Sequence, residues 1–356
     1  MASKKDIYSY MNFLFSKLPF FRRKERESSY YKNLKKLLED LLASSDGESH
    51  PIHCYSADDL IRATNNFSPS RTVKLGSYAM FRGFLDGRSI IVSKYYIRNW
   101  SNEDRDRSCV IRDIVISLQM SNHDNVLKLL GCCLEFPIPV LVHEYAAKGV
   151  LNPDGSLGGA SEDRIILPWN IRLRIAKQVA SAVSYLHTAF AGAIIHRHLN
   201  PRCLFLDDDY VPKLYDFSLS ITIPPPDSDV EDAVGGTLGY LDPAYMRSGC
   251  ISEKTDVYSF GVLLLVFLTG RKALEFNQAE GYGSVISYVL ECDGQIRAIV
   301  DPKIFEEVEE NKQIQQQLHD FLNLALFCTR DRIESRPDMV DVARELVRIE
   351  EFVMPS

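Results

Sequence analysis

The sequence predicts a bilobal α+β fold, in which a small strand-rich lobe is followed by a larger helical lobe. Between Phe67 and about residue 145, short runs of β-branched and aromatic residues alternate with turn residues, as is typical of strands. After residue 145 the apolar residues recur at helical spacing, for example from Ile171 to Leu186. The length of 356 residues suits one two-lobed domain.

Composition excludes several classes of protein. The net charge is −7, and this acidic balance argues against nucleic acid as a partner. The eight cysteines show no metal-site spacing, so we expect reduced thiols in a cytoplasmic protein. No apolar run reaches the roughly 18 residues that suggest a membrane span. The longest candidate, Val257 to Leu268, is predicted to be a buried core helix.

Residues 1–50 are predicted to form an amphipathic extension and a linker. Residues 8–21 are aromatic and apolar, and a basic cluster follows them. This segment suits a membrane surface, a partner protein or the body of the same chain. Five leucines then follow a helical pattern whose apolar face needs a cover: Leu34, Leu37, Leu38, Leu41 and Leu42.

The small lobe is assigned to residues 51–145 and the large lobe to residues 146–356. A helix is expected near Cys109–Met120, and Asp86-Gly87 indicates a hairpin turn. Four strands are expected: Ala79–Phe84, Ser89–Tyr95, Val126–Leu130 and Val140–His143.

Residues 194–207 (IIHRHLNPRCLFLD) resemble the catalytic loop of a protein kinase in which the chemistry has been replaced. In that loop an Asp accepts the proton of the substrate hydroxyl, and an Asn five residues later holds magnesium. Here His198 stands at the Asp position and Cys203 at the Asn position, while Asn200 replaces a lysine. We therefore expect no catalytic residues.

The resemblance to the kinase fold covers roughly residues 55–350. Four segments resemble plant receptor-like kinases of the wall-associated type: residues 56–67 (SADDLIRATNNF), 129–135 (LLGCCLE), 239–243 (GYLDP) and 254–262 (KTDVYSFGV). Without an extracellular domain or a span, the chain is similar to a receptor-like cytoplasmic kinase. Its degenerate catalytic loop resembles the plant pseudokinases that act as adaptors of an NLR (nucleotide-binding leucine-rich-repeat) immune receptor.

The resemblance implies a remnant nucleotide site. Lys94 matches the strand lysine that reaches the phosphates, and Asp216 could still ligate magnesium. Ser218 replaces the glycine of Asp-Phe-Gly and removes its torsional freedom. Tyr78 would crowd the phosphate path, and an ion pair between Lys94 and Asp113 is left open. We expect that no cofactor is required and that ATP with magnesium binds weakly or not at all.

Residues outside the nucleotide site make further predictions. His196, His198 and Cys203 suggest a zinc site, but a histidine at position 196 normally packs in the kinase core, so no metal site is expected. Asp256 should hold the backbone of the catalytic loop. Arg336 lacks its usual glutamate partner, because residues 242–244 (DPA) replace Ala-Pro-Glu. It should be exposed or repartnered, with a loosely anchored activation segment.

Residues 221–236 of that activation segment are proline-rich and acidic. Two interpretations stay open: a disordered, solvated loop, or a segment that becomes ordered only when a partner docks. We favour disorder in the free chain and order in a complex.

The resemblance implies a catalytically inactive adaptor in plant innate immunity that promotes resistosome assembly. Its partners would be the leucine-rich-repeat region of an NLR receptor and a receptor-like cytoplasmic kinase modified by a bacterial effector. This would place it in the cytoplasm, and at the plasma membrane when in complex. One alternative is a weakly active Ser/Thr kinase with His198 as base and Asp216 holding one magnesium ion. The other is a decoy substrate modified by a pathogen effector at Ser228 or Thr237.

Overall fold

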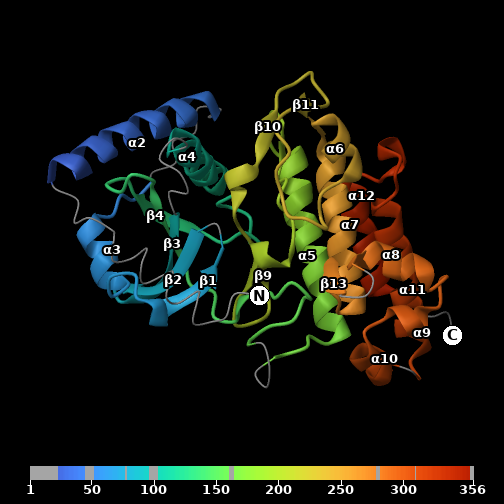
Figure 1. Ribbon diagram of the computed structural model, residues 1–356. Coiled ribbons are helices and arrows are strands. Elements are labelled where there is room, and N and C mark those ends of the chain that lie inside the picture. Colours follow the sequence, from blue (N-terminus) through green and yellow to red (C-terminus); the bar gives the residue numbers. More distant parts are fainter. Residues whose placement is uncertain are drawn as a thin grey trace.

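The computed structural model forms a small and a large lobe that lie side by side (Figure 1). It describes residues 23–44, 52–76, 78–95, 103–159, 164–277, 281–308 and 310–352. The small lobe contains an antiparallel sheet, and the large lobe is mostly helical. The predicted bilobal α+β class is thus confirmed.

The sheet of the small lobe has the strand order β1-β2-β3-β5-β4, and all its neighbouring strands are antiparallel. Its strands are β1 (Thr72–Leu75), β2 (Tyr78–Leu85), β3 (Arg88–Tyr95), β4 (Leu129–Cys133) and β5 (Val140–Glu144). The predicted strand at Val126 begins three residues later, at Leu129. Val126 instead forms an isolated bridge with Leu214 of the large lobe.

The two faces of this sheet have different neighbours. Ile90 and Val92 of β3 point outward, where they pack in a cluster with helix α3 (Ala57–Ala63) and Phe67. Ile91 points inward, where it packs with side chains of the large lobe. Because successive side chains of a strand point to opposite faces, Lys94 belongs to the outer face, and Ser93 and Tyr95 belong to the inner one.

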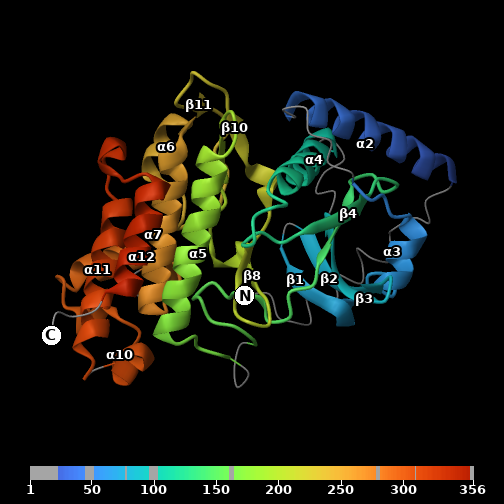
Figure 2. The same ribbon diagram turned by 180° about the vertical axis from the view of Figure 1, so that it is seen from behind.

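Two helices cover one side of the small lobe, and α2 (Arg23–Ser44) lies along α4 (Glu103–Gln119) in both views (Figures 1 and 2). Leu37 is buried in the cluster formed with α4. The Asn33 side chain is fully buried, and its Nδ2 donates to the carbonyl oxygens of Leu134 and Phe136, each at 2.8 Å. Arg107 Nε donates in turn to Asn33 Oδ1 at 2.8 Å. The predicted amphipathic helix is therefore anchored by polar as well as apolar contacts.

The body of the same chain covers only part of the leucine stripe of α2. Leu37 is 2% exposed, whereas Leu38 and Leu42 are 50% and 79% exposed. The apolar segment 8–21 and most of the predicted linker lie outside the described residues.

The large lobe is built around α7, which runs from Glu253 to Thr269 and is buried at every residue from Thr255 onward. This confirms the predicted core helix. The helices of this lobe are α5 (Trp169–Thr188), α6 (Pro243–Ser248), α7, α8 (Val285–Glu291), α9 (Ile296–Ile299), α10 (Pro302–Val308), α11 (Lys312–Cys328) and α12 (Met339–Glu351). Among the residues that the structure describes, no helix combines the length and apolarity that a membrane crossing needs.

The remaining elements are short strands and 3-10 turns. β6 (Gly149–Val150), β8 (Leu204–Leu206) and β9 (Pro212–Leu214) form one small sheet, and β7 (Ala193–Ile195) pairs with β10 (Ile221–Ile223). The other pairs are β11 (Val230–Glu231) with β12 (Cys250–Ile251) and β13 (Leu274–Asn277) with β14 (Gly281–Ser284). The 3-10 turns are η1 (Pro69–Arg71), η3 (Pro201–Cys203), η4 (Phe217–Leu219) and η5 (Ile333–Ser335).

Candidate nucleotide-site remnant between the lobes

Asp256, near the start of α7, holds the backbone of the catalytic-loop segment. Its carboxylate accepts hydrogen bonds from the backbone N–H of His196 at 2.7 Å and of Arg197 at 2.8 Å. A third contact, at 3.0 Å, joins it to His187 Nε2. Arg197 has a φ of +65°, which few residues other than glycine adopt. The scaffold role predicted for Asp256 is therefore confirmed.

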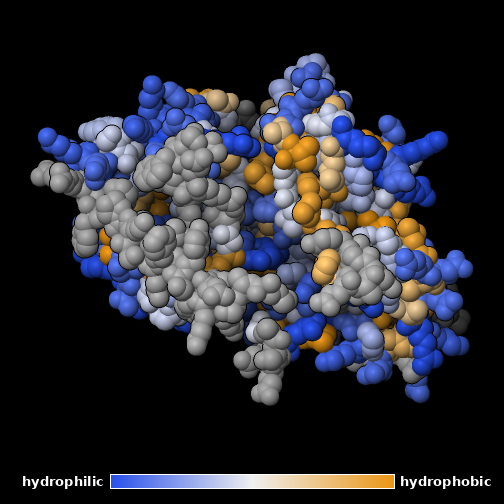
Figure 3. All heavy atoms as spheres, in the orientation of Figure 1, coloured by the Kyte–Doolittle hydropathy of each residue, from blue (hydrophilic) through white to orange (hydrophobic). Residues whose placement is uncertain are grey.

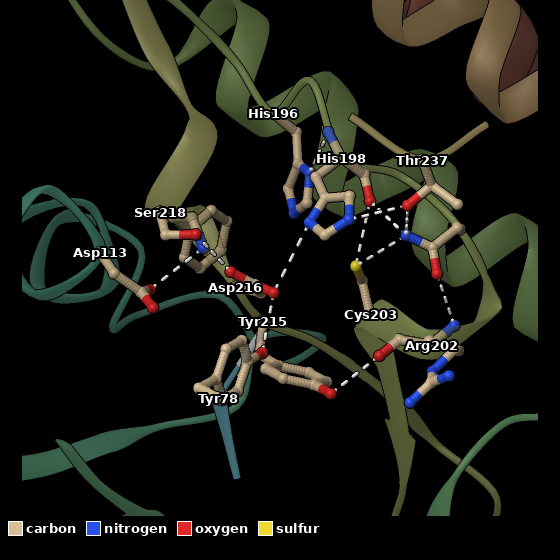
Figure 4. A network of polar contacts seen from close by, with 12 residues as sticks. Tyr78, Asp113, His196, His198, Arg202, Cys203, Tyr215, Asp216, Ser218 and Thr237 are labelled. Carbon is tan, nitrogen blue, oxygen red and sulfur yellow. Dashed lines mark hydrogen bonds and ion pairs between the residues drawn. The ribbon is translucent and has the colours of Figure 1, made fainter. Parts of the chain in front are cut away.

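The three replaced catalytic positions lie together in space, and two of them, His198 and Cys203, are labelled in Figure 4. His198 Nε2 is 2.8 Å from Thr237 Oγ1, and the Cys203 thiol donates to the carbonyl oxygen of His198 at 3.0 Å. Asn200 Nδ2 donates to the same carbonyl at 2.7 Å and lies 3.2 Å from Cys203 Sγ. The loop therefore forms a closed network instead of directing a carboxylate toward a substrate.

Asp216 faces this network from the start of η4. Its φ is +73°, its Oδ2 accepts from Tyr78 Oη at 2.8 Å and its Oδ1 accepts from Ser218 Oγ at 2.6 Å. Burial by itself would raise the pKa of Asp216, but the adjacent His198, and then Lys74, outweigh it and hold that pKa below its ordinary value. The carboxylate is thus charged and already has partners within the protein.

A second buried carboxylate, that of Asp113 in α4, is bonded to the residue that follows Asp216. It accepts the backbone N–H of Phe217 at 3.1 Å and the hydroxyl of Tyr95 at 2.9 Å. Burial, followed by the negative charge of Asp216, raises the pKa of Asp113 to about 7. Asp113 therefore positions the start of the activation segment through Phe217, and its side-chain partner from β3 is Tyr95.

The assignment of Lys94 to the nucleotide site is wrong. Its ammonium group lies 4.0 Å from the ring centre of Phe67 and 5.3 Å from that of Phe136, on the outer face of the sheet. Burial lowers the pKa of Lys94 to about 8. The preceding residue, Ser93, occupies the inner face. Lys94 and Asp113 do not form the ion pair that the sequence left open. Lys94 lies on the outer face of the sheet, whereas Asp113 accepts a hydrogen bond from Tyr95 on the inner face.

Side chains of both lobes fill the space on the inner face of the sheet. Met80 and Ile91 of the small lobe and Phe205 of the large lobe are each fully buried in one cluster with Tyr78 and Tyr215. A ligand inserted between the lobes here would have to separate these contacts. The expectation that Tyr78 crowds the phosphate path agrees with its bond to Asp216.

Lys74 of β1 adds a cation where phosphates would be expected from the resemblance. Its Nζ donates to Tyr215 Oη at 2.7 Å and to the carbonyl oxygen of Arg202 at 3.1 Å, and so bridges the lobes. It also lies 4.8 Å from the ring centres of Tyr78 and Tyr215. Desolvation lowers its pKa, and the charge of Asp216 opposes that shift.

Arg336 is buried and repartnered, which was one of the two predicted outcomes. Its guanidinium makes two hydrogen bonds to Asp242, at 2.5 Å and 2.9 Å, and a third to the carbonyl oxygen of Lys254 at 3.1 Å. Asp242 lies two residues before the position of the missing glutamate and replaces it. The expectation of a loosely anchored activation segment is therefore wrong at this end.

The rest of the activation segment has a defined path in the structure. Ile221–Ile223 pairs with β7 and Val230–Glu231 pairs with β12. The Arg197 guanidinium reaches Asp232 at 2.8 Å and the carbonyl oxygen of Ala233 at 2.7 Å. The structure therefore does not match the disorder that we favoured for the free chain, although residues 224–229 expose their side chains.

The donor atoms near Asp216 differ from those of a magnesium site. His198, Cys203 and Asp216 offer a nitrogen, a sulfur and an oxygen within 4.8 Å of one another. Magnesium in proteins prefers oxygen ligands in an octahedral arrangement, so this set does not fit it. His196, which the sequence suggested as a metal ligand, is turned away: its Nδ1 accepts the backbone N–H of His198 and its ring packs on Phe217.

Several residues of the network were missed at the level of sequence. Tyr95 could have been found, because counting the strand alternation from Ile91 places it on the inner face. Lys74, Tyr215 and Thr237 gave no comparable signal, since their contacts join segments far apart in the chain.

Comparisons with known proteins identify relatives of this chain. Residues 76–345 match the protein kinase domain family. The non-functional pseudokinase ZRK2 of Arabidopsis thaliana is 41% identical over 343 residues, which cover 92% of this chain and 93% of ZRK2. The serine/threonine-protein kinase ZRK1 of the same plant is 39% identical, over 92% of this chain and 95% of ZRK1.

The chain belongs to the protein kinase family, in the branch of the ZRK proteins. This confirms the resemblance to plant pseudokinases at the level of the family. A putative wall-associated receptor kinase-like 16 of the same plant is 33% identical over 327 residues, in line with the motifs of the wall-associated type; the match covers 90% of this chain and 72% of that relative. Because ZRK relatives are named both as non-functional pseudokinases and as kinases, the catalytic status of this ZRK protein depends on its own site residues.

Proposed function

We propose that this protein is a catalytically inactive adaptor that links the leucine-rich-repeat region of an NLR immune receptor to an effector-modified receptor-like cytoplasmic kinase. The partners come from the sequence resemblance. The observation that carries the loss of catalysis is the histidine at the position of the catalytic base. His198 contacts Thr237 through its ring and Cys203 through its backbone carbonyl oxygen, and no carboxylate stands at this position.

The chemistry of phosphoryl transfer is missing several independent parts. The loss of a positioned base typically costs about 10²–10⁴-fold in rate. An imidazole at this position is already 2.8 Å from a threonine hydroxyl, and the thiol of Cys203 replaces an oxygen ligand of magnesium. The strand lysine is replaced on the inner face by Ser93. These losses concern both positioning and electrostatic stabilisation, so their effects accumulate.

Nucleotide binding is opposed by the packing of the same region. Met80, Ile91 and Phe205 have no exposed surface, and the Lys74 bridge joins the lobes beside Asp216. A bound nucleotide would have to replace these contacts. ATP with magnesium therefore binds weakly or not at all, and the adaptor requires no cofactor.

Two exposed apolar surfaces suit the two protein partners. One lies on α2, where Tyr31, Leu38 and Leu42 are 69%, 50% and 79% exposed. The other is formed by Met246 of α6 and by Leu238, which precedes that helix, and these side chains are 50% and 70% exposed. Hydrophobic side chains also gather near α6 on the face seen in Figure 3. Exposed apolar patches often mark protein-binding sites. The α2 surface faces the receptor, and the α6 surface faces the modified kinase.

The adaptor function is tested by co-precipitation of the full chain with the leucine-rich-repeat region and with the modified kinase. The substitution Leu42→Glu should reduce capture of the receptor region and leave capture of the kinase unchanged. Leu238→Glu should give the reverse result. Undiminished binding of both partners by both variants would argue against this assignment of surfaces, and failure of the wild-type chain to bind either partner would refute the adaptor proposal.

A weakly active Ser/Thr kinase is the second candidate, and the retained Asp216, together with the similarity to the serine/threonine-protein kinase ZRK1, favours it. This candidate predicts that ATP with magnesium raises the melting temperature, since a ligand that binds the folded state stabilises it. It also predicts phosphate transfer that is lost in Asp216→Ala. Neither effect is expected for the adaptor.

A further inference from the structure

The cluster of His198, Cys203 and Asp216 contains the atoms of a transition-metal site. Their ligand atoms all lie within 4.8 Å of one another, and His198 Nδ1 is 3.6 Å from Asp216 Oδ2. This Nδ1 is buried and makes no hydrogen bond among the described residues. A polar atom that is buried without a hydrogen bond carries a free-energy cost, and a metal ion between these groups would remove that cost.

We propose that His198 Nδ1, Cys203 Sγ and the Asp216 carboxylate bind one zinc ion, in place of the magnesium of an active kinase. Zinc accepts nitrogen, sulfur and carboxylate ligands in a tetrahedral arrangement. In such a site the ligand atoms lie about 3.3–3.8 Å apart, so closure of the present cluster requires a movement of about 1 Å. A water molecule or a hydroxyl would complete the coordination.

The hydrogen bonds around the cluster suit zinc as well. A histidine that ligates a metal usually donates its other N–H to a neighbouring oxygen, which fixes the ring. His198 Nε2 is 2.8 Å from Thr237 Oγ1, on the side of the ring opposite Nδ1. Thr237 is therefore a positioning residue for the metal ligand and ties the activation segment to the site.

The charges balance when zinc binds. Without metal, the Cys203 thiol donates to the carbonyl oxygen of His198 at 3.0 Å, so the sulfur carries its proton. Zinc binding breaks this S–H bond, forms a Zn–S bond and releases the proton to solvent. A thiolate, a carboxylate and a neutral imidazole then surround a divalent ion, and the buried site has no net charge. Zinc would join the catalytic loop at residues 198–203 to the start of the activation segment at Asp216.

The test uses the purified full-length chain, stripped with a chelator and titrated with cobalt(II) as a spectroscopic substitute for zinc. We expect one cobalt ion per chain, with the absorption bands of a tetrahedral thiolate site, and displacement by zinc but not by an equal concentration of magnesium. Cys203→Ser and His198→Gln should abolish these bands. Thr237→Val should weaken affinity by about 10–100-fold, as is typical for a group that orients a ligand.

The matched control is Cys54→Ser, since Cys54 is exposed and forms a strand bridge with Cys132, a second pair of thiols that could bind metal adventitiously. This variant should keep the cobalt bands and their displacement by zinc. The proposal is overturned if the wild-type chain shows no thiolate bands, or if Cys203→Ser and His198→Gln keep them. Circular dichroism establishes whether each variant is folded. If Cys203→Ser does not fold, the result with His198→Gln decides the test.

Discussion

Tyr78 Oη donates a 2.8 Å hydrogen bond to Asp216 Oδ2, and this bond joins the first strands of the small lobe to the start of the activation segment, 138 residues later. In the proposed adaptor it has two effects. It adds a donor from the protein to an oxygen that a kinase would offer to magnesium, and it holds the two lobes together.

We expect Tyr78→Phe to lower the free energy of unfolding by about 1–3 kcal/mol, because a buried carboxylate oxygen loses its donor. Urea denaturation provides the measurement. Tyr31→Phe is the control, since Tyr31 is 69% exposed, and it should change little. Equal effects of the two substitutions would show that the Tyr78 bond contributes no stability.

The buried pair of Arg336 and Asp242 should be much more sensitive. Asp242→Ala leaves an unpaired buried guanidinium and should cost about 3–5 kcal/mol in the free energy of unfolding. Glu39→Ala removes an exposed pair with Lys35, 3.9 Å long, and should cost less than about 1 kcal/mol. A small effect of Asp242→Ala would mean that Arg336 finds another partner or reaches solvent.

The raised pKa of Asp113 predicts a dependence of stability on pH. An unfolded aspartate has a pKa of about 3.9, and the folded value is about 7. The contribution of Asp113 to stability is therefore most favourable below the unfolded pKa, declines as the pH rises, and is lost above the folded pKa.

Asp113→Asn removes this charge and keeps an oxygen that can accept the Phe217 N–H. Its stability relative to the wild type should increase between pH 4 and pH 7 and then level off. Denaturation curves across this range test the prediction. A difference that does not change with pH would indicate that Asp113 titrates normally in the folded protein.

Helix α2 offers a comparison between a buried and an exposed leucine. Leu37→Ala should cost about 2–5 kcal/mol, because Leu37 packs against α4. Leu42→Ala, at a residue that is 79% exposed, should remain within about 0.5 kcal/mol of the wild type. If both substitutions have small effects, α2 contributes little to the stability of the small lobe.

Restoration of the kinase residues should not restore activity. The triple substitution His198→Asp, Asn200→Lys and Cys203→Asn rebuilds the catalytic loop, but Met80, Ile91 and Phe205 still fill the space between the lobes. We expect no phosphate transfer above that of the same variant carrying Asp216→Ala, measured with labelled ATP. Transfer above that background would show that the catalytic loop alone limits the wild-type chain.

The two-lobed class and the core helix α7 could be predicted because their signals are local. An apolar run of sufficient length is buried wherever it lies, and the spacing of turns and strands repeats within short windows. The same holds for the scaffold role of Asp256, which follows from its place in a motif. The prediction for Lys94 was wrong by one position along β3. A shift of one residue along a strand moves a side chain to the other face, so Ser93 faces inward and Lys94 outward.

By itself the sequence determined the kinase scaffold and the loss of the usual residues at positions 198, 200 and 203. Only the tertiary structure decided what those positions became. Tyr78 and Asp216 are 138 residues apart, and Arg336 and Asp242 are 94 apart. Such contacts depend on how the lobes and loops pack, and not on the pattern within any one segment. The hydrogen-bond partners of a residue, and the atoms that surround a possible metal ion, are therefore decided by the fold, although the sequence names every residue involved.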